Sequence, residues 1–158
     1  MENYGFTAPE MHHIIKNKPT FVLYEEDFKE KGTGILMLKQ LLVDEMGFSH
    51  DTMKTLIVKF PYVLGKTKEE MQKYFETLAK YHTSKKDAMD YLLKCPKLLS
   101  IDLEANLKEI IFLFELYHQM SELETLKIFR AFPYLACSNQ RKLQRYLGEF
   151  RKYKLTPK

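Results

Sequence analysis

The side chains with the clearest chemical potential are the cations near the end of the sequence. Residues 139–158 contain seven lysines and arginines and one acid, Glu149, which gives a net charge of +6. The whole chain of 158 residues carries +4, so the other 138 residues carry −2. A local excess of positive charge favours an anionic partner, and nucleic-acid phosphate is a common one. The candidate binding residues are Arg141, Lys142, Arg145, Arg151 and Lys152.

Three of these cations, Arg141, Arg145 and Lys152, recur at the spacing of one helical face. Gly148 falls on the same stripe. The opposite face is apolar and is expected to pack on the core; its residues are Leu143, Tyr146, Leu147 and Phe150. The terminal helix of any repeat array needs a polar outer face, but an ordinary solvated face mixes charges of both signs. The near absence of acids therefore favours a binding face.

The histidines and cysteines do not form a recognisable catalytic or metal-binding motif. His82 and His118 each follow a tyrosine, and neither has a second histidine or cysteine three or four residues away. Cys95 and Cys137 lack the spacing of a metal or redox motif, and fit a reducing compartment or small buried positions. We therefore expect no enzyme activity, no metal, no cofactor and no small-molecule substrate.

Tyrosine rings are further candidates, because they can stack on nucleic-acid bases. The tyrosines at regular positions are Tyr74, Tyr81, Tyr117, Tyr146 and Tyr153. All of them lie on apolar helical stripes, so packing in the core is the preferred interpretation.

The elements that must position these residues follow an apolar pattern that occurs three times, each copy 36 residues after the last. The last five residues of each copy stand at i, i+3, i+4, i+7 and i+10, which is one stripe of an α-helix. The copies are Leu56, Ile57, Met71, Tyr74, Phe75, Leu78 and Tyr81; Leu92, Leu93, Leu107, Ile110, Ile111, Phe114 and Tyr117; and Ile128, Phe129, Leu143, Tyr146, Leu147, Phe150 and Tyr153. A fixed period of this length is typical of a helical-repeat array, which usually binds a partner along its length.

A proline separates the two apolar blocks of each copy. The prolines are Pro61, Pro96 and Pro133. Because proline stops a helix, each unit should consist of a short helix, a proline turn and a long helix. A degenerate fourth unit precedes these three, since Ile15 stands four residues before Pro19 in the same relation. We predict an all-α helical-repeat solenoid of about four units in a single domain, residues 11–158, after an N-terminal arm, residues 1–10.

Local signals also place several helix ends. Thr67 with Glu70 is a capping box, which predicts the start of a long helix there. Another helix should begin near Ile35, and Gly47 is placed to cap its C-terminal end.

Composition narrows the class of protein. Hydrophobic residues make up 45% and charged residues 29%, as in ordinary globular proteins. No apolar run approaches the roughly 18 residues that a membrane helix needs, so no membrane insertion is expected. The first twenty residues contain no arginine and are not typical of a transit peptide. Import into an organelle would therefore use an internal signal or a start upstream of the printed one.

The three proline turns share a proline, one further residue and then a hydrophobic residue, on the pattern Pro-x-hydrophobic-Leu. They are Phe60-Pro61-Tyr62-Val63-Leu64, Cys95-Pro96-Lys97-Leu98-Leu99 and Phe132-Pro133-Tyr134-Leu135. Together with the Gly-hydrophobic-Ser corner at Gly47-Phe48-Ser49, they resemble the repeat of the mitochondrial transcription termination factor (mTERF) family, of which the chain is identified as a short member. The later corners lack the glycine. The resemblance covers residues 11–153 and implies a curved α-solenoid of mitochondria or chloroplasts that binds DNA or RNA, or sits on ribosomes and other assemblies.

The resemblance and the basic end together favour a nucleic-acid-binding adaptor, with structured RNA preferred over duplex DNA. We expect an accessory subunit of a mitochondrial assembly such as the ribosome, with RNA or another anionic surface at the C-terminal helix and protein subunits as further partners. One alternative is a protein-only scaffold in a respiratory or other large complex. Another is a DNA-binding transcription termination factor, which would need phosphate contacts along several units. Residues 1–138, at −2, do not readily offer them.

Overall fold

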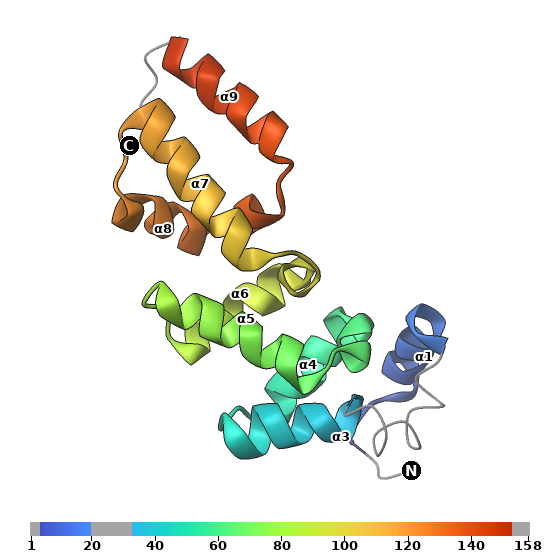
Figure 1. Ribbon diagram of the computed structural model, residues 1–158. Coiled ribbons are helices and arrows are strands. Elements are labelled where there is room, and N and C mark those ends of the chain that lie inside the picture. The colour runs from blue at the N-terminus through green and yellow to red at the C-terminus, as the bar shows by residue number, and fades with distance from the viewer. Residues whose placement is uncertain (1–3, 20–32, 153–158) are drawn as a thin grey trace.

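The computed structural model describes residues 4–19 and 33–152, with the backbone alone for Phe150. Every regular element in these two ranges is helical, which confirms the predicted all-α helical-repeat class (Figure 1). In chain order the elements are α1 (Ala8–Asn17), α3 (Ile35–Leu38), the π-helical η2 (Lys39–Glu45), α4 (His50–Lys59), η3 (Pro61–Gly65), α5 (Lys68–Lys80), α6 (Lys85–Lys94), η4 (Pro96–Ser100), α7 (Leu103–His118), α8 (Glu122–Ala131), η5 (Pro133–Cys137) and α9 (Gln140–Lys152).

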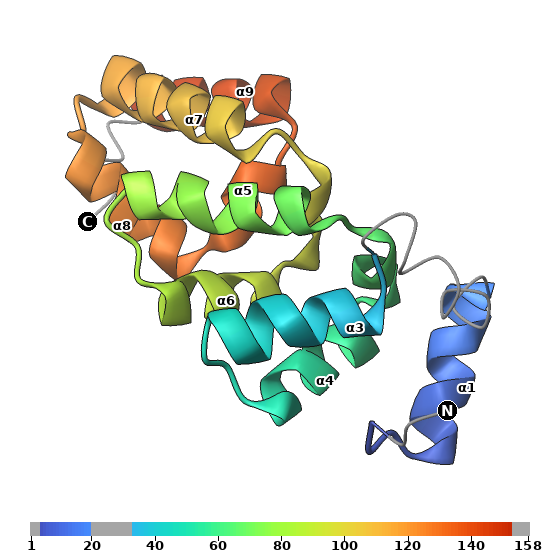
Figure 2. The ribbon, with the colours of Figure 1, turned by 60° about the horizontal axis from the view of Figure 1, so that its bottom comes forward.

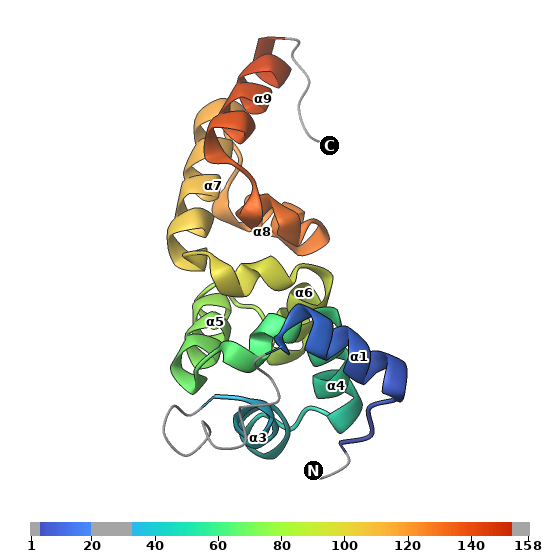
Figure 3. The same ribbon diagram turned by 90° about the vertical axis from the view of Figure 1, so that its right-hand side faces the viewer.

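The units stack in chain order along one axis. Each of the last three units consists of a short helix, a 3₁₀ turn and a long helix, and the long helices pack in sequence, α5 on α7 and α7 on α9. The short helices do the same, α1 on α4 and α4 on α6. Figure 2 and Figure 3 show α3 and α4 at one end of the molecule and α7 and α9 at the other. Among the described helices, α9 therefore has a neighbouring long helix on one side only, α7.

Hydroxyl side chains fix where the short helices and α5 begin. Ser49, Ser84 and Ser121 each accept a hydrogen bond from the backbone N–H three residues further on, at 3.1, 3.1 and 3.4 Å. Thr67 caps α5 in the same way, and the Glu70 carboxylate accepts a bond from the Thr67 N–H at 2.9 Å, which confirms the predicted capping box. These bonds satisfy N–H groups that have no partner within their helix.

A proline fixes where each short helix ends. The C-cap residues Phe60, Cys95 and Phe132 have φ of −141°, −137° and −131°, and each is followed by the proline that opens a 3₁₀ turn. Proline disfavours helical backbone at the residue before it, yet its fixed φ suits the first position of a new helical turn. The predicted order of short helix, proline turn and long helix follows from these two properties.

The repeat is less regular than a fixed spacing of 36 residues. The serine caps Ser49, Ser84 and Ser121 are 35 and then 37 residues apart, and the prolines follow the same steps. The short helices therefore align by their prolines, which places a buried residue four positions earlier in each: Ile57, Leu92 and Phe129. Only the long-helix stripe keeps the spacing of 36, and its first positions are all buried: Met71, Leu107 and Leu143.

Tyr81 and Tyr117, the last members of their apolar stripes, occupy different positions in their helices. Tyr81 is the C-cap residue of α5, whereas Tyr117 lies inside the last turn of the longer helix α7. Both are half-buried, and Tyr153 lies outside the described residues. The three additional residues of α7 explain the difference in position.

The corners between units use the left-handed backbone conformation. Gly47, His82 and Gln119 have φ of 77°, 56° and 55°, and each stands two residues before the serine that caps the next short helix. Glycine adopts this conformation without strain, whereas a residue with a Cβ does not. The later corners thus keep the geometry of Gly47-Phe48-Ser49 although they lack its glycine.

The first unit departs from prediction at its start. Helix α1 begins at Ala8 behind a capping box of Thr7 and Glu10, so residues 8–10 are helical and do not belong to an arm. The second helix begins at Ile35 as predicted, but its C-terminal half is the π-helix η2, in which the Met46 N–H donates to the Leu41 carbonyl at 3.0 Å.

Phe114 and Phe112 provide a matched pair for testing the packing of α7. Phe114 is 5% exposed and Phe112 is 57% exposed. We expect Phe114→Ala to cost about 3–5 kcal/mol of unfolding free energy, as for other deletions of buried aromatics. Phe112→Ala should cost less than about 1 kcal/mol. Thermal melts of both variants test this, and equal melting temperatures would contradict the assigned face of α7.

The corner at Gln119 can be relieved of strain. We expect Gln119→Gly to raise the unfolding free energy by about 0.5–1 kcal/mol, because glycine tolerates positive φ but is more flexible in the unfolded chain. Gly47→Ala should lower it by about 1–2 kcal/mol through the backbone alone, since no atom lies within 4 Å of the added Cβ. Urea titrations measure both changes. Changes of the same sign would rule out a shared left-handed corner.

Candidate nucleic-acid interface

Helix α9 is held at the end of the stack through its apolar side chains and its first turn. Leu143 and Leu147 are 9% and 4% exposed, and α9 packs on α7. The Gln140 side-chain amide donates to the Asn106 side-chain carbonyl at 3.3 Å. Asn106 in turn donates to the Ala136 carbonyl at 2.8 Å, so α7 is tied to both α9 and η5.

All the predicted basic site residues lie exposed on this one helix. They are Arg141, Lys142, Arg145, Arg151 and Lys152. Lys152 pairs with Glu149, Nζ to Oε1 at 2.8 Å, at a position where both side chains are largely exposed. Within the described ranges the other four make no ion pair with an acid. Their positive charge is therefore uncompensated and available to an anionic partner.

The buried face of α9 is rotated from the predicted one. Tyr146, expected in the core, is 51% exposed. Gly148, expected on the basic stripe, faces α7, because a Cβ added there would lie 3.6 Å from the Tyr117 ring. The physical reason is that α9 has a long-helix neighbour on one side only, so it buries a narrower stripe, centred on Leu143 and Leu147. The side chain of Phe150 lies outside the described residues.

The rotation places an aromatic ring among the cations. The Arg145 guanidinium carbon lies 5.4 Å from the centroid of the Tyr146 ring, within the range of a cation–π contact. Exposed rings beside cations bind unpaired nucleotides, with bases stacked on the ring and phosphates on the charges. The sequence offered Tyr146 as a stacking candidate but favoured a core position for it; its place next to Arg145 in the last unit was the signal for an exposed one.

The two histidines considered in the sequence lie at the ends of different helices. His82 is exposed at a corner and His118 is half-buried at the end of α7. No group of three or more histidines, cysteines or acids that could hold a metal occurs among the described residues. Among the described helices, none has the length and apolar character that crossing a membrane requires.

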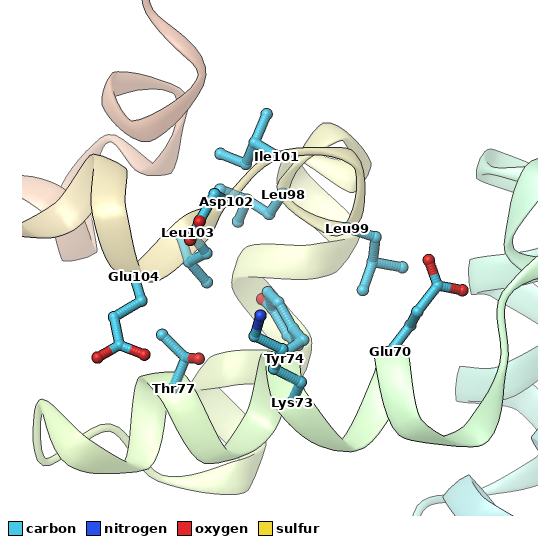
Figure 4. A pocket seen from close by; sticks show the side chains of 10 residues that line it. All are labelled: Glu70, Lys73, Tyr74, Thr77, Leu98, Leu99, Ile101, Asp102, Leu103 and Glu104. Carbon is cyan, nitrogen blue, oxygen red and sulfur yellow. The ribbon is translucent and has the colours of Figure 1, made fainter.

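A cleft of about 170 Å³ lies between α5 and the start of α7 (Figure 4). Its lining residues are Glu70, Lys73, Tyr74, Thr77, Leu98, Leu99, Ile101, Asp102, Leu103 and Glu104. Figure 4 shows Glu70 and Glu104 at opposite ends of the cleft. Lys108 and Lys80 bind the Glu104 carboxylate at 3.0 and 3.1 Å and lower its pKa. Acidic ends and a volume below the roughly 300–1,000 Å³ of ligand pockets make this cleft unsuited to nucleic-acid phosphate.

Neighbouring residues Tyr146 and Leu147 test the rotation of α9. Leu147→Ala should cost about 2–4 kcal/mol, because Leu147 is 4% exposed. Tyr146→Ala should cost less than about 1 kcal/mol, since the ring loses mainly its contact with Arg145. Chemical denaturation of the two variants distinguishes them. A larger loss of unfolding free energy for Tyr146→Ala than for Leu147→Ala would contradict the rotation and support the buried face predicted from the sequence.

Comparison with known proteins supports the repeat fold. The mTERF family model matches residues 36–155. No curated protein and no solved structure matches the chain. Membership of the mTERF family indicates a nucleic-acid-binding helical-repeat protein of a kind commonly found in organelles. Because the match spans every unit from α4 to α9, the chain belongs to the mTERF family.

Proposed function

We propose that this protein is an mTERF adaptor that binds structured RNA through α9, as an accessory subunit of a mitochondrial assembly such as the ribosome. One observation carries the proposal: four cations without an ion-pair partner among the described residues share the exposed side of the terminal helix with the exposed ring of Tyr146. The mitochondrial location rests on family membership.

The small extent of this surface favours structured RNA over duplex DNA. A protein that wraps a duplex needs phosphate contacts spread over many residues, and residues 1–138 carry a net charge of −2. RNA loops and bulges present closely spaced phosphates and unstacked bases at one place. The α9 surface offers a matching combination, with cations such as Arg141 and Arg145 for phosphates and Tyr146 for a base.

A few phosphate contacts do not bind tightly alone, so the protein should also be held by protein subunits. The outer side of α7 supports this. Phe112 and Leu116 are 57% and 50% exposed and lie one helical turn apart. Exposed apolar groups on one helical face are typical of protein contacts. The same pair supports the alternative function, a protein-only scaffold in a respiratory or other large complex. Transcription termination on DNA is the third candidate and lacks such a supporting contact surface.

Charge reversal on α9 tests the RNA proposal. The triple variant Arg141→Glu, Arg145→Glu, Lys152→Glu should keep the melting temperature of the native chain, because Leu143 and Leu147 are unchanged. Its affinity for an RNA hairpin, measured by fluorescence anisotropy, should fall at least tenfold. The native protein should show a slope of about −2 to −4 in log affinity against log salt, as expected for three or four phosphate contacts.

The control variant changes the same charge elsewhere. Lys85, Lys86 and Lys127 are exposed lysines on α6 and α8, and their replacement by Glu should leave hairpin affinity within about twofold at moderate salt. A matched DNA duplex should bind more weakly than the hairpin. Equal losses in both triple variants would indicate a non-specific charge effect and contradict an α9 site.

Purification from mitochondria separates the two main functions. The tagged native protein should co-purify with RNA and release its assembly after ribonuclease treatment or charge reversal on α9. If the protein kept the whole assembly under both conditions, the RNA-adaptor function would be contradicted and the protein-scaffold function supported.

A further inference from the structure

The two cysteines of the chain meet at the junction between neighbouring units. Cys95 is the C-cap residue of α6, directly before η4, and Cys137 is the last residue of η5. Their Sγ atoms lie 3.4 Å apart although 42 residues separate them in sequence. Both are free thiols; Cys95 is 1% exposed and Cys137 is half-buried. No part of the proposed RNA surface includes them.

The packing around the two cysteines keeps their thiols close together. The turns η4 and η5 pack against each other, and the Asn106 side chain binds the carbonyl of Ala136, next to Cys137. A disulfide bond needs the sulfurs at about 2.0 Å. The remaining gap of about 1.4 Å is within reach of rotation of the two side chains about their Cα–Cβ bonds.

We propose that Cys95 and Cys137 form an intramolecular disulfide when the protein meets a peroxide, and that this bond links consecutive units of the solenoid. The half-buried Cys137 reacts first. Its thiolate attacks one peroxide oxygen, the O–O bond breaks, and Cys137 becomes a sulfenic acid while hydroxide leaves and takes up a proton. The Cys95 sulfur then attacks the sulfenic sulfur, the S–O bond breaks, and the hydroxyl leaves as water with the Cys95 proton. Two thiols are oxidised and one peroxide is reduced to two waters.

The environment of Cys137 determines the rate of this reaction. Burial, with the contact to the Cys95 sulfur, raises the pKa of Cys137 to about 12. The thiol is therefore protonated at neutral pH and oxidises slowly compared with a catalytic cysteine. Such a pair stays reduced under ordinary conditions and closes during sustained oxidation. The bond would fix the angle between the unit that contains α7 and the terminal unit that contains α9.

The purified full-length protein is incubated with excess hydrogen peroxide for several hours and compared with untreated protein. Intact mass spectrometry should show the loss of two hydrogen masses, and maleimide labelling of the denatured protein should fall from two thiols to none. The melting temperature should rise by about 5–10 °C, because closing a long loop restricts the unfolded chain. Dithiothreitol should reverse all three changes.

Cys137→Ser is the first control, because its partly exposed position makes the change mild. This variant should fold and show neither the mass loss nor the rise in melting temperature, and Cys95→Ala should behave alike if it folds. The proposal is overturned if peroxide leaves both thiols free, if oxidised protein runs as a disulfide-linked dimer, or if Cys137 gains two oxygens while Cys95 still reacts with maleimide.

Discussion

The structure depends on one backbone restriction, that of the residue before a proline. Phe60, Cys95 and Phe132 cannot continue their helices, so the chain turns at the same point in each of the last three units. The following 3₁₀ turn leads into a long helix, and α7 and α9 each pack on the long helix before them. Since one unit buries too little apolar surface to offset its chain entropy, stability comes from stacking, and stacking requires that these turns match. The last two proline turns, η4 and η5, pack directly against each other.

This restriction explains which parts of the fold the sequence predicts well. Proline positions, capping residues and a helical stripe are local signals, so the helix types and most helix starts followed from them. The capping box of Thr7 and Glu10 was equally local and would have placed the start of α1 correctly. The long-helix stripe keeps the predicted spacing of 36 residues, whereas the caps and prolines are 35 and then 37 residues apart, because α7 is longer than α5. The π-helical turn η2 has no comparable signal in the sequence.

The basic residues of the candidate site were identified from the sequence, but the orientation of α9 that presents them was not. Apolar periodicity identifies a stripe, whereas the number of neighbouring helices decides how much of it is buried. Tyr74 in an inner unit is 4% exposed, whereas Tyr146 at the same stripe position of the terminal unit is 51% exposed. The contact of Cys95 with Cys137 has the same origin, because it exists only after units stack. One cysteine stands directly before Pro96 and the other four residues after Pro133. Because the last two proline turns pack together, these positions would have suggested that the two cysteines lie close to each other.

The end of a stack is a favourable place for a binding surface in a repeat protein. An inner long helix such as α7 has neighbours on both sides, so most substitutions on its flanks disturb an interface. Helix α9 needs only the side that carries Leu143 and Leu147 for packing, which leaves the rest of its surface free to carry uncompensated charge. A row of like charges is destabilising where helices meet, but it costs little on a surface in contact with water. Residues 139–158 carry a net charge of +6, and the rest of the chain carries −2. The positive charge is thus concentrated on the helix that uses little of its surface for packing. The terminal unit can therefore acquire a partner without weakening the junctions that hold the other units together.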